Sequence, residues 1–301
     1  MKTIILGPPG TGKTTTLLDL VDEFIQQGVR PKQIGYFSFT KKAATEAANR
    51  AAEKFGLDIE NDLSNFRTLH SLAFRNLGMT KEKMMKIEDY KEFGQKCGIP
   101  IRTANYSTED GTFNSDNEYL TIINTARVKR LDLLEYYDSR KNILDIERST
   151  LFLLAEELQK FKKEKGLKDF TDLLEDFIEK SLPGSLEVLF IDEAQDLSLI
   201  QWEMVRHLWK HAKKTYIAGD DDQAIFKWAG ADVDHFIALK EEVNDIKVLD
   251  QSYRIPGGPI HELSQKIINK VQNRFQKEYK PRDEIGLLKR YSDITQVDMS
   301  K

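Results

Sequence analysis

Short apolar runs alternate with longer amphipathic stretches along much of this chain. Each apolar run is flanked by polar residues and is short enough to be a strand that is buried on both faces. The intervening segments, such as Thr15 to Gln27, carry apolar residues at helical spacing. Strands that alternate with helices pair in parallel, so the pattern predicts an α/β fold with a doubly wound, mostly parallel sheet. The predicted strands are Lys2 to Leu6, Gln33 to Phe39, Asn65 to Thr68, Val188 to Asp192, Thr215 to Ala218 and Ile246 to Leu249.

The stretch from about Arg75 to Lys168 does not alternate in this way. It carries amphipathic helical patterns separated by a polar segment, Arg102 to Asn117, which contains an Asp110-Gly111 turn signal. We therefore predict a mainly helical subdomain at residues 76–168, inserted between two parts of the sheet domain at 1–75 and 169–250. The helical patterns cover Lys81 to Lys96, Glu118 to Tyr137 and Ile143 to Lys165.

Composition places the chain among ordinary globular proteins and excludes several classes. Of its 301 residues, 40% are hydrophobic and 31% are charged, which is enough to bury a sizeable core. The single cysteine, Cys97, excludes an internal disulfide and fits a reducing compartment. No apolar run approaches the length of a membrane span, so no membrane contact is expected. The net charge of −4 argues weakly against a nucleic-acid surface, which must then be inferred from local motifs.

The segment Gly7 to Thr14 (GPPGTGKT) matches the phosphate-binding loop pattern. It follows a predicted strand and opens a predicted helix, which makes a chance glycine-rich turn the weaker interpretation. Lys13 supplies positive charge to the β- and γ-phosphates of a nucleoside triphosphate, and Thr14 supplies a hydroxyl to Mg²⁺. The residues expected to bind nucleotide here are Gly7, Pro8, Pro9, Gly10, Thr11, Gly12, Lys13, Thr14 and Thr15.

A second motif, Asp192-Glu193, ends the apolar run VLFID. An aspartate at the carboxyl end of a buried strand can hold the Mg²⁺ that bridges the β- and γ-phosphates. Glu193 is placed to activate a water, which makes hydrolysis the predicted reaction. The alternative is a strand that simply ends in an acidic turn, and the phosphate loop makes that less favoured.

Seven stretches in order give the chain a specific resemblance. They are GPPGTGKT, FSFTKKAA (Phe37 to Ala44), TLHSLAF (Thr68 to Phe74), DFTDLL (Asp169 to Leu174), IDEAQD (Ile191 to Asp196), AGDDDQAIFKWAGAD (Ala218 to Asp232) and LDQSYR (Leu249 to Arg254). The chain resembles the N-terminal, ATP-binding portion of UvrD/Rep/PcrA-type superfamily 1 DNA helicases. The resemblance covers the chain to about residue 260 and implies a RecA-like P-loop NTPase sheet with ATP and Mg²⁺ as cofactors.

The resemblance also assigns residues to the ATP site. It implies that Gln223 senses the γ-phosphate and that Arg254 acts as an arginine finger on the phosphoryl oxygens. It implies that Tyr253 stacks on adenine. With Lys13, Asp192 and Glu193, these complete the expected catalytic set. Without the resemblance, Gln223 would be interpreted as a surface amide, Arg254 as a solvated arginine and Tyr253 as a core tyrosine.

For DNA, the resemblance implies contacts to single strands and to junctions between single and double strands. Aromatic faces stack on any base, which suits a protein that tolerates all sequences. The alternative for Phe39 and Trp228 is that they are ordinary core residues. The implied DNA-binding residues are Phe39, Thr40, Lys42, Thr68, His70, Phe226 and Trp228.

Two departures from the family pattern qualify the expected function. The family's glutamine motif upstream of the phosphate loop has no counterpart before Met1, so adenine selectivity is in doubt. After Arg254 we expect only the start of a second RecA-like lobe at 251–301, with a helix at Ile260 to Phe275 and a strand at Ile285 to Leu288. A further protein segment would then have to complete that lobe.

The expected function is that of an ATP-dependent DNA helicase or translocase, incomplete as a motor on its own, in the cytoplasm of a bacterial or phage-infected cell. Two other classes stay open. One is an ATP-gated module that binds or loads single-stranded DNA without unwinding duplex. The other is a P-loop enzyme for small molecules, such as a kinase, which Glu193 and the downstream motifs disfavour.

Overall fold

A parallel six-stranded sheet forms the centre of the computed structural model, which describes residues 1–107, 109–143, 145–180, 186–289 and 292–293. The strand order is β3-β2-β6-β7-β1-β8, and every neighbouring pair is parallel. Each strand predicted for this sheet is present within a residue or two, which confirms the α/β class. The strands are β1 (Lys2–Leu6), β2 (Ile34–Ser38), β3 (Phe66–Arg67), β6 (Val188–Asp192), β7 (Lys214–Gly219) and β8 (Asp245–Val248).

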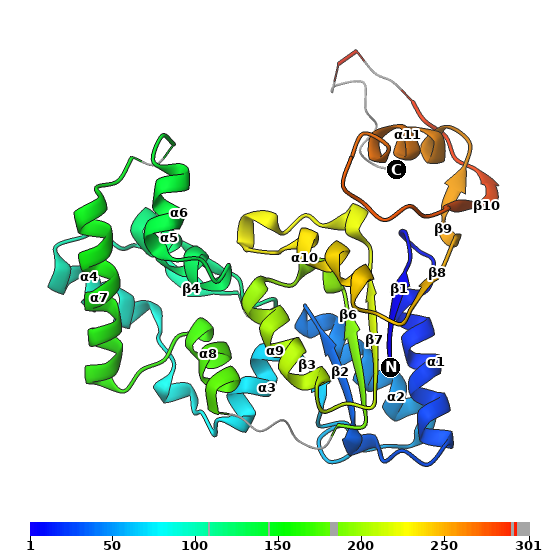
Figure 1. Ribbon diagram of the computed structural model, residues 1–301, viewed down its shortest axis with the longest axis horizontal. Coiled ribbons are helices and arrows are strands. Elements are labelled where there is room, and N and C mark those ends of the chain that lie inside the picture. Colours follow the sequence, from blue (N-terminus) through cyan, green and yellow to red (C-terminus); the bar gives the residue numbers. More distant parts are fainter. Residues whose placement is uncertain (108, 144, 181–185, 290–291, 294–301) are drawn as a thin grey trace.

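Helices cover both faces of this sheet (Figure 1). Alternate strand residues point to opposite faces, so Ile5 and Phe190 join one buried cluster while Ile4 and Ile191 join the other. The first cluster includes residues of α1 (Lys13–Gln26) and α2 (Lys41–Phe55). The second is larger, surrounds the fully buried Trp202 and includes residues of α3 (Leu69–Asn76), α8 (Phe170–Lys180), α9 (Leu199–Trp209) and α10 (Val233–Ala238).

The inserted segment has a hydrophobic core of its own, centred on side chains such as Phe93, Leu120 and Phe161. It lies to the left of the sheet in Figure 1. Its helices are α4 (Ile87–Cys97), α5 (Glu118–Val128), α6 (Leu133–Arg140) and α7 (Arg148–Lys165), and its hairpin pairs β4 (Ala104–Tyr106) with β5 (Phe113–Ser115).

Two sequence expectations for this segment need correction. The pattern Glu118 to Tyr137 is two helices, because the chain turns at Arg130, which has a φ of 52°. The pattern that begins at Ile143 becomes helical only at Arg148, after residue 144, which lies outside the described residues. The Asp110-Gly111 turn signal is confirmed, and the turn forms the tip of a hairpin, β4–β5, that was not predicted.

A buried ionic cluster ties the insertion to α8. Arg127 donates to Asp169 at 2.7 Å and to Asp172 at 2.6 Å, and Lys162 donates to the same two carboxylates at 2.7 and 2.8 Å. Burial would raise the pKa of Asp169, but Arg127 and Lys162 outweigh it and hold that pKa well below its usual range. The DFTDLL stretch is therefore a joint between the insertion and the sheet domain.

The segment after β8 lies at the upper right of Figure 1 and has a small two-stranded sheet of its own. Strand β9 (Gln251–Gly257) pairs in parallel with β10 (Lys280–Ile285), and α11 (Pro259–Ile268) lies between them in sequence. The predicted helix to Phe275 was too long, because Phe275 instead packs on Phe236 with ring centroids 5.6 Å apart.

The predicted strand at Ile285 to Leu288 was misplaced, since β10 consists mostly of polar, exposed residues and ends at Ile285. Short 3₁₀ turns complete the described elements at Pro31–Gln33, Lys81–Lys83, Ala194–Asp196, Asp221–Gln223, Lys227–Ala229 and Leu239–Glu241.

Candidate functional site

The loop between β1 and α1 curls tightly and ends at the N-terminus of α1. Gly10 and Gly12 have φ values of 74° and 82°, a region that suits glycine. Gly12 is the N-cap of α1, and no side chain caps the helix there, so its first amides have no side-chain acceptor. The Lys13 ammonium donates to the Gly7 carbonyl at 2.8 Å, which folds the side chain back over the loop. The predicted phosphate loop therefore has the geometry of an anion site.

A cavity of about 340 Å³ opens beside this loop and brings most of the predicted catalytic residues together. Glu193 reaches it from the end of β6, Gln223 from the turn after β7, and Arg254 from β9. The full lining is Pro9, Gly10, Thr11, Gly12, Lys13, Thr14, Thr15, Ala43, Glu46, Arg50, Glu193, Gln223 and Arg254. Of the predicted nucleotide-binding residues, Gly7, Pro8 and Tyr253 do not line it.

Asp192 lies beneath the cavity and is bound to Thr14. The Thr14 hydroxyl donates to an Asp192 carboxylate oxygen at 3.0 Å, and the Tyr36 hydroxyl donates to the same oxygen at 2.7 Å. Burial, followed by the charge of Glu193, raises the pKa of Asp192 even though these hydrogen bonds oppose the shift. A buried carboxylate beside a hydroxyl and a second carboxylate is the kind of all-oxygen donor set that Mg²⁺ binds. The residues present thus fit the predicted cation.

Glu193 has a strained backbone. Its φ of 53° is unusual for a residue other than glycine. This conformation ends β6 abruptly, and Gln195 donates to the Glu193 carboxylate at 2.9 Å. An acidic residue held at the wall of this cavity is suited to accept a proton from water.

The start of β9 is fixed directly to the phosphate loop. The Tyr253 amide donates to the Gly10 carbonyl at 2.8 Å, and the Ser252 hydroxyl donates to the Pro9 carbonyl at 2.9 Å. A side-chain carbon placed on Gly10 would lie 2.4 Å from Cβ of Arg254. This close approach brings Arg254 to the cavity. The Tyr253 ring is 74% exposed, and its contact with adenine stays a prediction.

The predicted DNA-binding aromatics form a row that runs from the core to the surface. The rings of Phe39 and Phe226 have centroids 5.1 Å apart, and those of Phe226 and Trp228 lie 6.3 Å apart. Phe39 is 5% exposed and packs in the main core, as the alternative interpretation expected, whereas Trp228 is 64% exposed. Trp228 is thus the member of the row best exposed to meet a base.

The other predicted DNA-binding residues have local structural roles or are covered. The hydroxyls of Thr40 and Thr68 cap α2 and α3, accepting from Ala43 and Ser71 amides at 3.2 Å each. The His70 ring lies close under the hairpin tip, where a side chain on Gly111 would meet it at 2.7 Å. Burial lowers the pKa of His70 to about 4, so its ring is neutral at pH 7. Lys42 is exposed at the start of α2.

Sequence reasoning missed Tyr36, which contacts Asp192, and the residues of α2 that line the cavity. Tyr36 looks like a core residue, and its bond to Asp192, 156 positions away, has no local sequence signal. Arg50 reaches the cavity from α2 beside Glu46 and Ala43. Positions 43, 46 and 50 follow helical spacing, so the helical face that carries Arg50 could have been identified once one member was known.

The parallel sheet, with the phosphate loop between β1 and α1, defines the fold as that of a P-loop NTPase with a RecA-like sheet. The model for the UvrD/REP helicase N-terminal domain matches residues 1–244, and the chain belongs to that family.

Curated relatives agree with this assignment at low identity. The chain is 26% identical to the ATP-dependent DNA helicase Rep of Escherichia coli over 84% of its length and 39% of the relative. It is 29% identical to a probable DNA helicase II homolog of Rickettsia conorii, over 91% of the chain and 43% of the relative. A probable DNA helicase II homolog of Mycoplasma pneumoniae is 26% identical, over 83% of the chain and 38% of the relative. The chain thus spans about two fifths of the length of these relatives.

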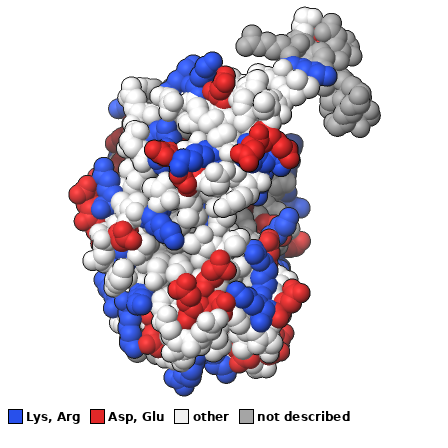
Figure 2. Space-filling view, turned by 90° about the vertical axis from the view of Figure 1, so that its right-hand side faces the viewer, with Lys and Arg blue, Asp and Glu red and all other residues white. Residues whose placement is uncertain are grey.

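Figure 2 shows acidic and basic side chains interspersed over one face, as the near-neutral composition leads one to expect. Among the described residues, no helix combines the length and apolar character needed to cross a membrane.

Proposed function

We propose that this chain is the ATP-binding part of a DNA helicase or translocase that couples Mg-ATP hydrolysis to movement on single-stranded DNA. The observation that carries the proposal is the meeting of Lys13, Thr14, Glu193, Gln223 and Arg254 at one cavity beside the phosphate loop. Those side chains come from four separate segments of the chain. Chance juxtaposition of charges and amides suited to phosphate is therefore a poor explanation.

The proposed chemistry divides the work among these side chains. Backbone amides of Gly10 to Thr14 and the Lys13 ammonium hold the β- and γ-phosphates. Thr14 and Asp192 hold Mg²⁺, which when bound offsets phosphate charge. Glu193 takes a proton from the attacking water, while Gln223 and Arg254 stabilise charge on the γ-phosphoryl oxygens. Tyr253 stacks on adenine.

The proposed DNA contact lies around Trp228 and Phe226, in the segment that follows β7. Both belong to the same chain segment as Gln223. A movement of Gln223 on binding the γ-phosphate would therefore shift the aromatic row through only a few intervening residues. We assign 1–75 and 169–250 to the ATP-binding lobe, 76–168 to the inserted subdomain and 251–301 to the start of a second lobe. Strand junctions and a protein segment that completes that lobe are the proposed further partners.

A second candidate is an ATP-gated module that binds single-stranded DNA without unwinding. The observation that favours it is the position of the β4–β5 hairpin tip. The Lys41 amide donates to the Glu109 carbonyl at 2.7 Å, and Gly111 covers His70. The hairpin thus lies over the stretch proposed to follow DNA, as a gate would.

The test is the ATP hydrolysis rate of the chain with and without a single-stranded oligonucleotide, compared with Glu193→Gln and Lys13→Ala variants. We expect the oligonucleotide to stimulate hydrolysis by the wild-type chain. Glu193→Gln should lower kcat by about a hundredfold or more while nucleotide still binds, and Lys13→Ala should weaken nucleotide binding itself. Binding of ATP and DNA without hydrolysis would favour the gated module, and absence of nucleotide binding would overturn both.

A further inference from the structure

A buried ionic cluster joins the turn after β7 to the segment that follows α11. The Lys277 side chain is fully buried (0% exposed) and contacts three consecutive carboxylates. Its ammonium lies 2.9 Å from an oxygen of Asp220 and 2.9 Å from an oxygen of Asp222, and it also donates to Asp221. One buried cation thus gathers three acidic side chains of a single turn.

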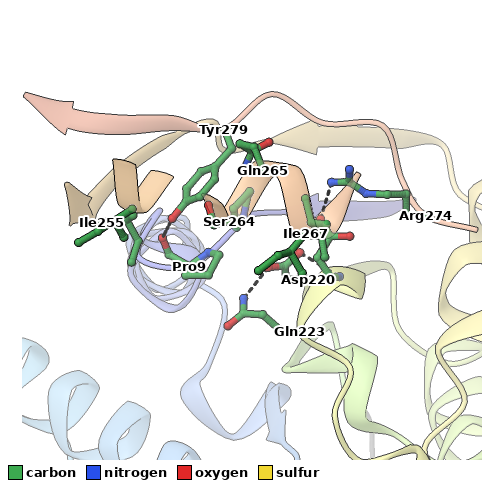
Figure 3. Close-up of a pocket in the computed structure, with 13 residues that line it drawn as sticks. Pro9, Asp220, Gln223, Ile255, Ser264, Gln265, Ile267, Arg274 and Tyr279 are labelled. Atoms are coloured by element: carbon green, nitrogen blue, oxygen red, sulfur yellow. Dashed lines mark hydrogen bonds and ion pairs between the residues drawn. The ribbon is translucent and has the colours of Figure 1, made fainter. Parts of the chain in front are cut away.

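Two further contacts fix the same turn. Arg274 donates to Asp222 at 2.5 Å, and the Phe275 amide donates to Asp221 at 2.8 Å. Figure 3 shows the Arg274 guanidinium directed across the cavity roof toward this turn. Burial would lower the pKa of Lys277, but the three aspartates outweigh it and raise that pKa, so the ammonium stays charged. Without that charge, three carboxylates would face each other in a buried site.

Gln223 is attached to this cluster through Asp220. One oxygen of Asp220 accepts from Lys277. The other accepts from the Gln223 side-chain amide, as Figure 3 shows. The Asp220 amide in turn donates to Gln195 at 3.0 Å, and Gln195 donates to Glu193 at 2.9 Å. A continuous chain of polar contacts therefore runs from Lys277 to the proposed general base.

Gln223 also lies between two cavities. It lines the phosphate cavity on one side, and on the other a mainly apolar cavity of about 300 Å³ bounded by Pro8, Pro9 and α11. Rotation of the side chain away from Asp220 would carry its amide toward the phosphate side. The position of Asp220 therefore decides where the amide rests before a phosphate arrives.

We propose that Lys277 is a positioning residue for Gln223, acting through Asp220, and thereby links the state of the γ-phosphate site to the segment after α11. This inference rests on the proposed function, since Gln223 must meet a γ-phosphate for its position to matter. Lys277 fixes the position of Asp220 and offsets its charge. Asp220 then holds the Gln223 amide by a hydrogen bond weak enough for the amide to leave when a γ-phosphate binds. When Lys277 loses its charge, the turn opens or Asp220 binds the amide too tightly, and in both cases the γ-phosphate contact is lost.

The test measures how well the full chain distinguishes a non-hydrolysable ATP analogue from ADP, both with Mg²⁺. The ratio of the two Kd values isolates the contribution of the γ-phosphate. Gln223→Ala should lower this ratio about tenfold, the scale of one hydrogen bond to a charged group. We expect Lys277→Met to lower it by a similar factor while the Kd for ADP changes little. The double variant should show no further loss, because both changes remove the same contact.

Lys280→Met is the matched control, because Lys280 pairs with Asp250 at the surface and is 56% exposed. It should leave the ratio unchanged. Should Lys277→Met melt below the assay temperature, the double variant Lys277→Met/Asp221→Asn, which removes one negative charge as well, decides by the same criterion.

The failures are distinguishable. A wild-type chain that binds neither nucleotide overturns the proposed function and this inference with it. A wild-type chain that binds both equally overturns the role of Gln223, and the inference falls again. A variant lacking the Lys277 charge that keeps the wild-type ratio, while Gln223→Ala loses it, overturns this inference alone.

Discussion

The hydroxyl of Thr14 lies 3.0 Å from a carboxylate oxygen of Asp192, across 178 residues of sequence. Thr14 lies in the first turn of α1, which follows β1, and Asp192 ends β6; strand β7 lies between these two strands in the sheet. Their contact joins the phosphate loop to the acidic motif, and these two side chains would hold the proposed Mg²⁺.

This contact predicts that Thr14→Ala weakens Mg²⁺-dependent nucleotide binding. The variant loses one oxygen ligand but keeps Lys13 and the loop amides, so the Mg²⁺ concentration for half-maximal ATP binding should rise about tenfold. Nucleotide binding measured in EDTA should change little. Thr16→Ala is the control, because Thr16 lies on the same helix outside the cavity lining. An equal loss with and without Mg²⁺ would contradict the assignment.

The aromatic row predicts opposite outcomes at its two ends. Trp228→Ala should weaken single-stranded DNA binding by about 1–3 kcal/mol and leave stability within about 0.5 kcal/mol, because the ring is exposed. Phe39→Ala should destabilise the chain by about 3–5 kcal/mol, because its ring is buried. Fluorescence anisotropy and thermal melts measure both quantities. Ile225→Ala, an exposed neighbour that is not aromatic, is the control. Undiminished DNA binding by Trp228→Ala would remove that residue from the proposed interface.

His70 predicts a loss of stability in mild acid. Burial lowers its pKa from 6.5 to about 4. Between these pH values the His70 ring is protonated in the unfolded chain and neutral in the folded chain. The free energy of unfolding should therefore fall as pH drops from 6.5 toward 4. Melts of His70→Gln should show a shallower fall over this range. An NMR titration in which the His70 ring protonates near pH 6.5 would show that the hairpin tip does not cover it in solution.

Asp196 predicts a stability change of opposite sign. Burial, and then the charge of Glu193, raises its pKa from 3.8 to about 7, so the folded chain holds this proton more tightly than the unfolded chain. The contribution of this carboxyl to stability therefore falls as pH rises from 3.8 to 7. Asp196→Asn should raise Tm more at pH 8 than at pH 5, with both variants measured in the same salt. An equal shift at the two pH values would point to packing instead of charge.

Most of the sheet was predictable because β1, β2 and β6 are apolar runs buried on both faces, and they lie next to recognisable motifs. The VLFID run and the phosphate loop each carry their chemistry in adjacent residues, which is why Lys13, Asp192 and Glu193 could be identified locally. Strand β10 was not, because an exposed strand of polar residues has no apolar signature. Tyr36 and Lys277 were missed for another reason: each acts through a carboxylate far away in sequence.

At Gly10 of the phosphate loop, substitution is opposed by the fold itself, independently of any bound nucleotide. Any side chain there would collide with Arg254, and its φ of 74° already disfavours one. At Gly12 the nearest atom to an added carbon is 3.9 Å away, so only backbone conformation opposes a substitution. A library of variants selected for folding alone, with no nucleotide present, should therefore be depleted at position 10 more than at position 12. Part of what looks like a signature for ATP is a requirement of the fold itself.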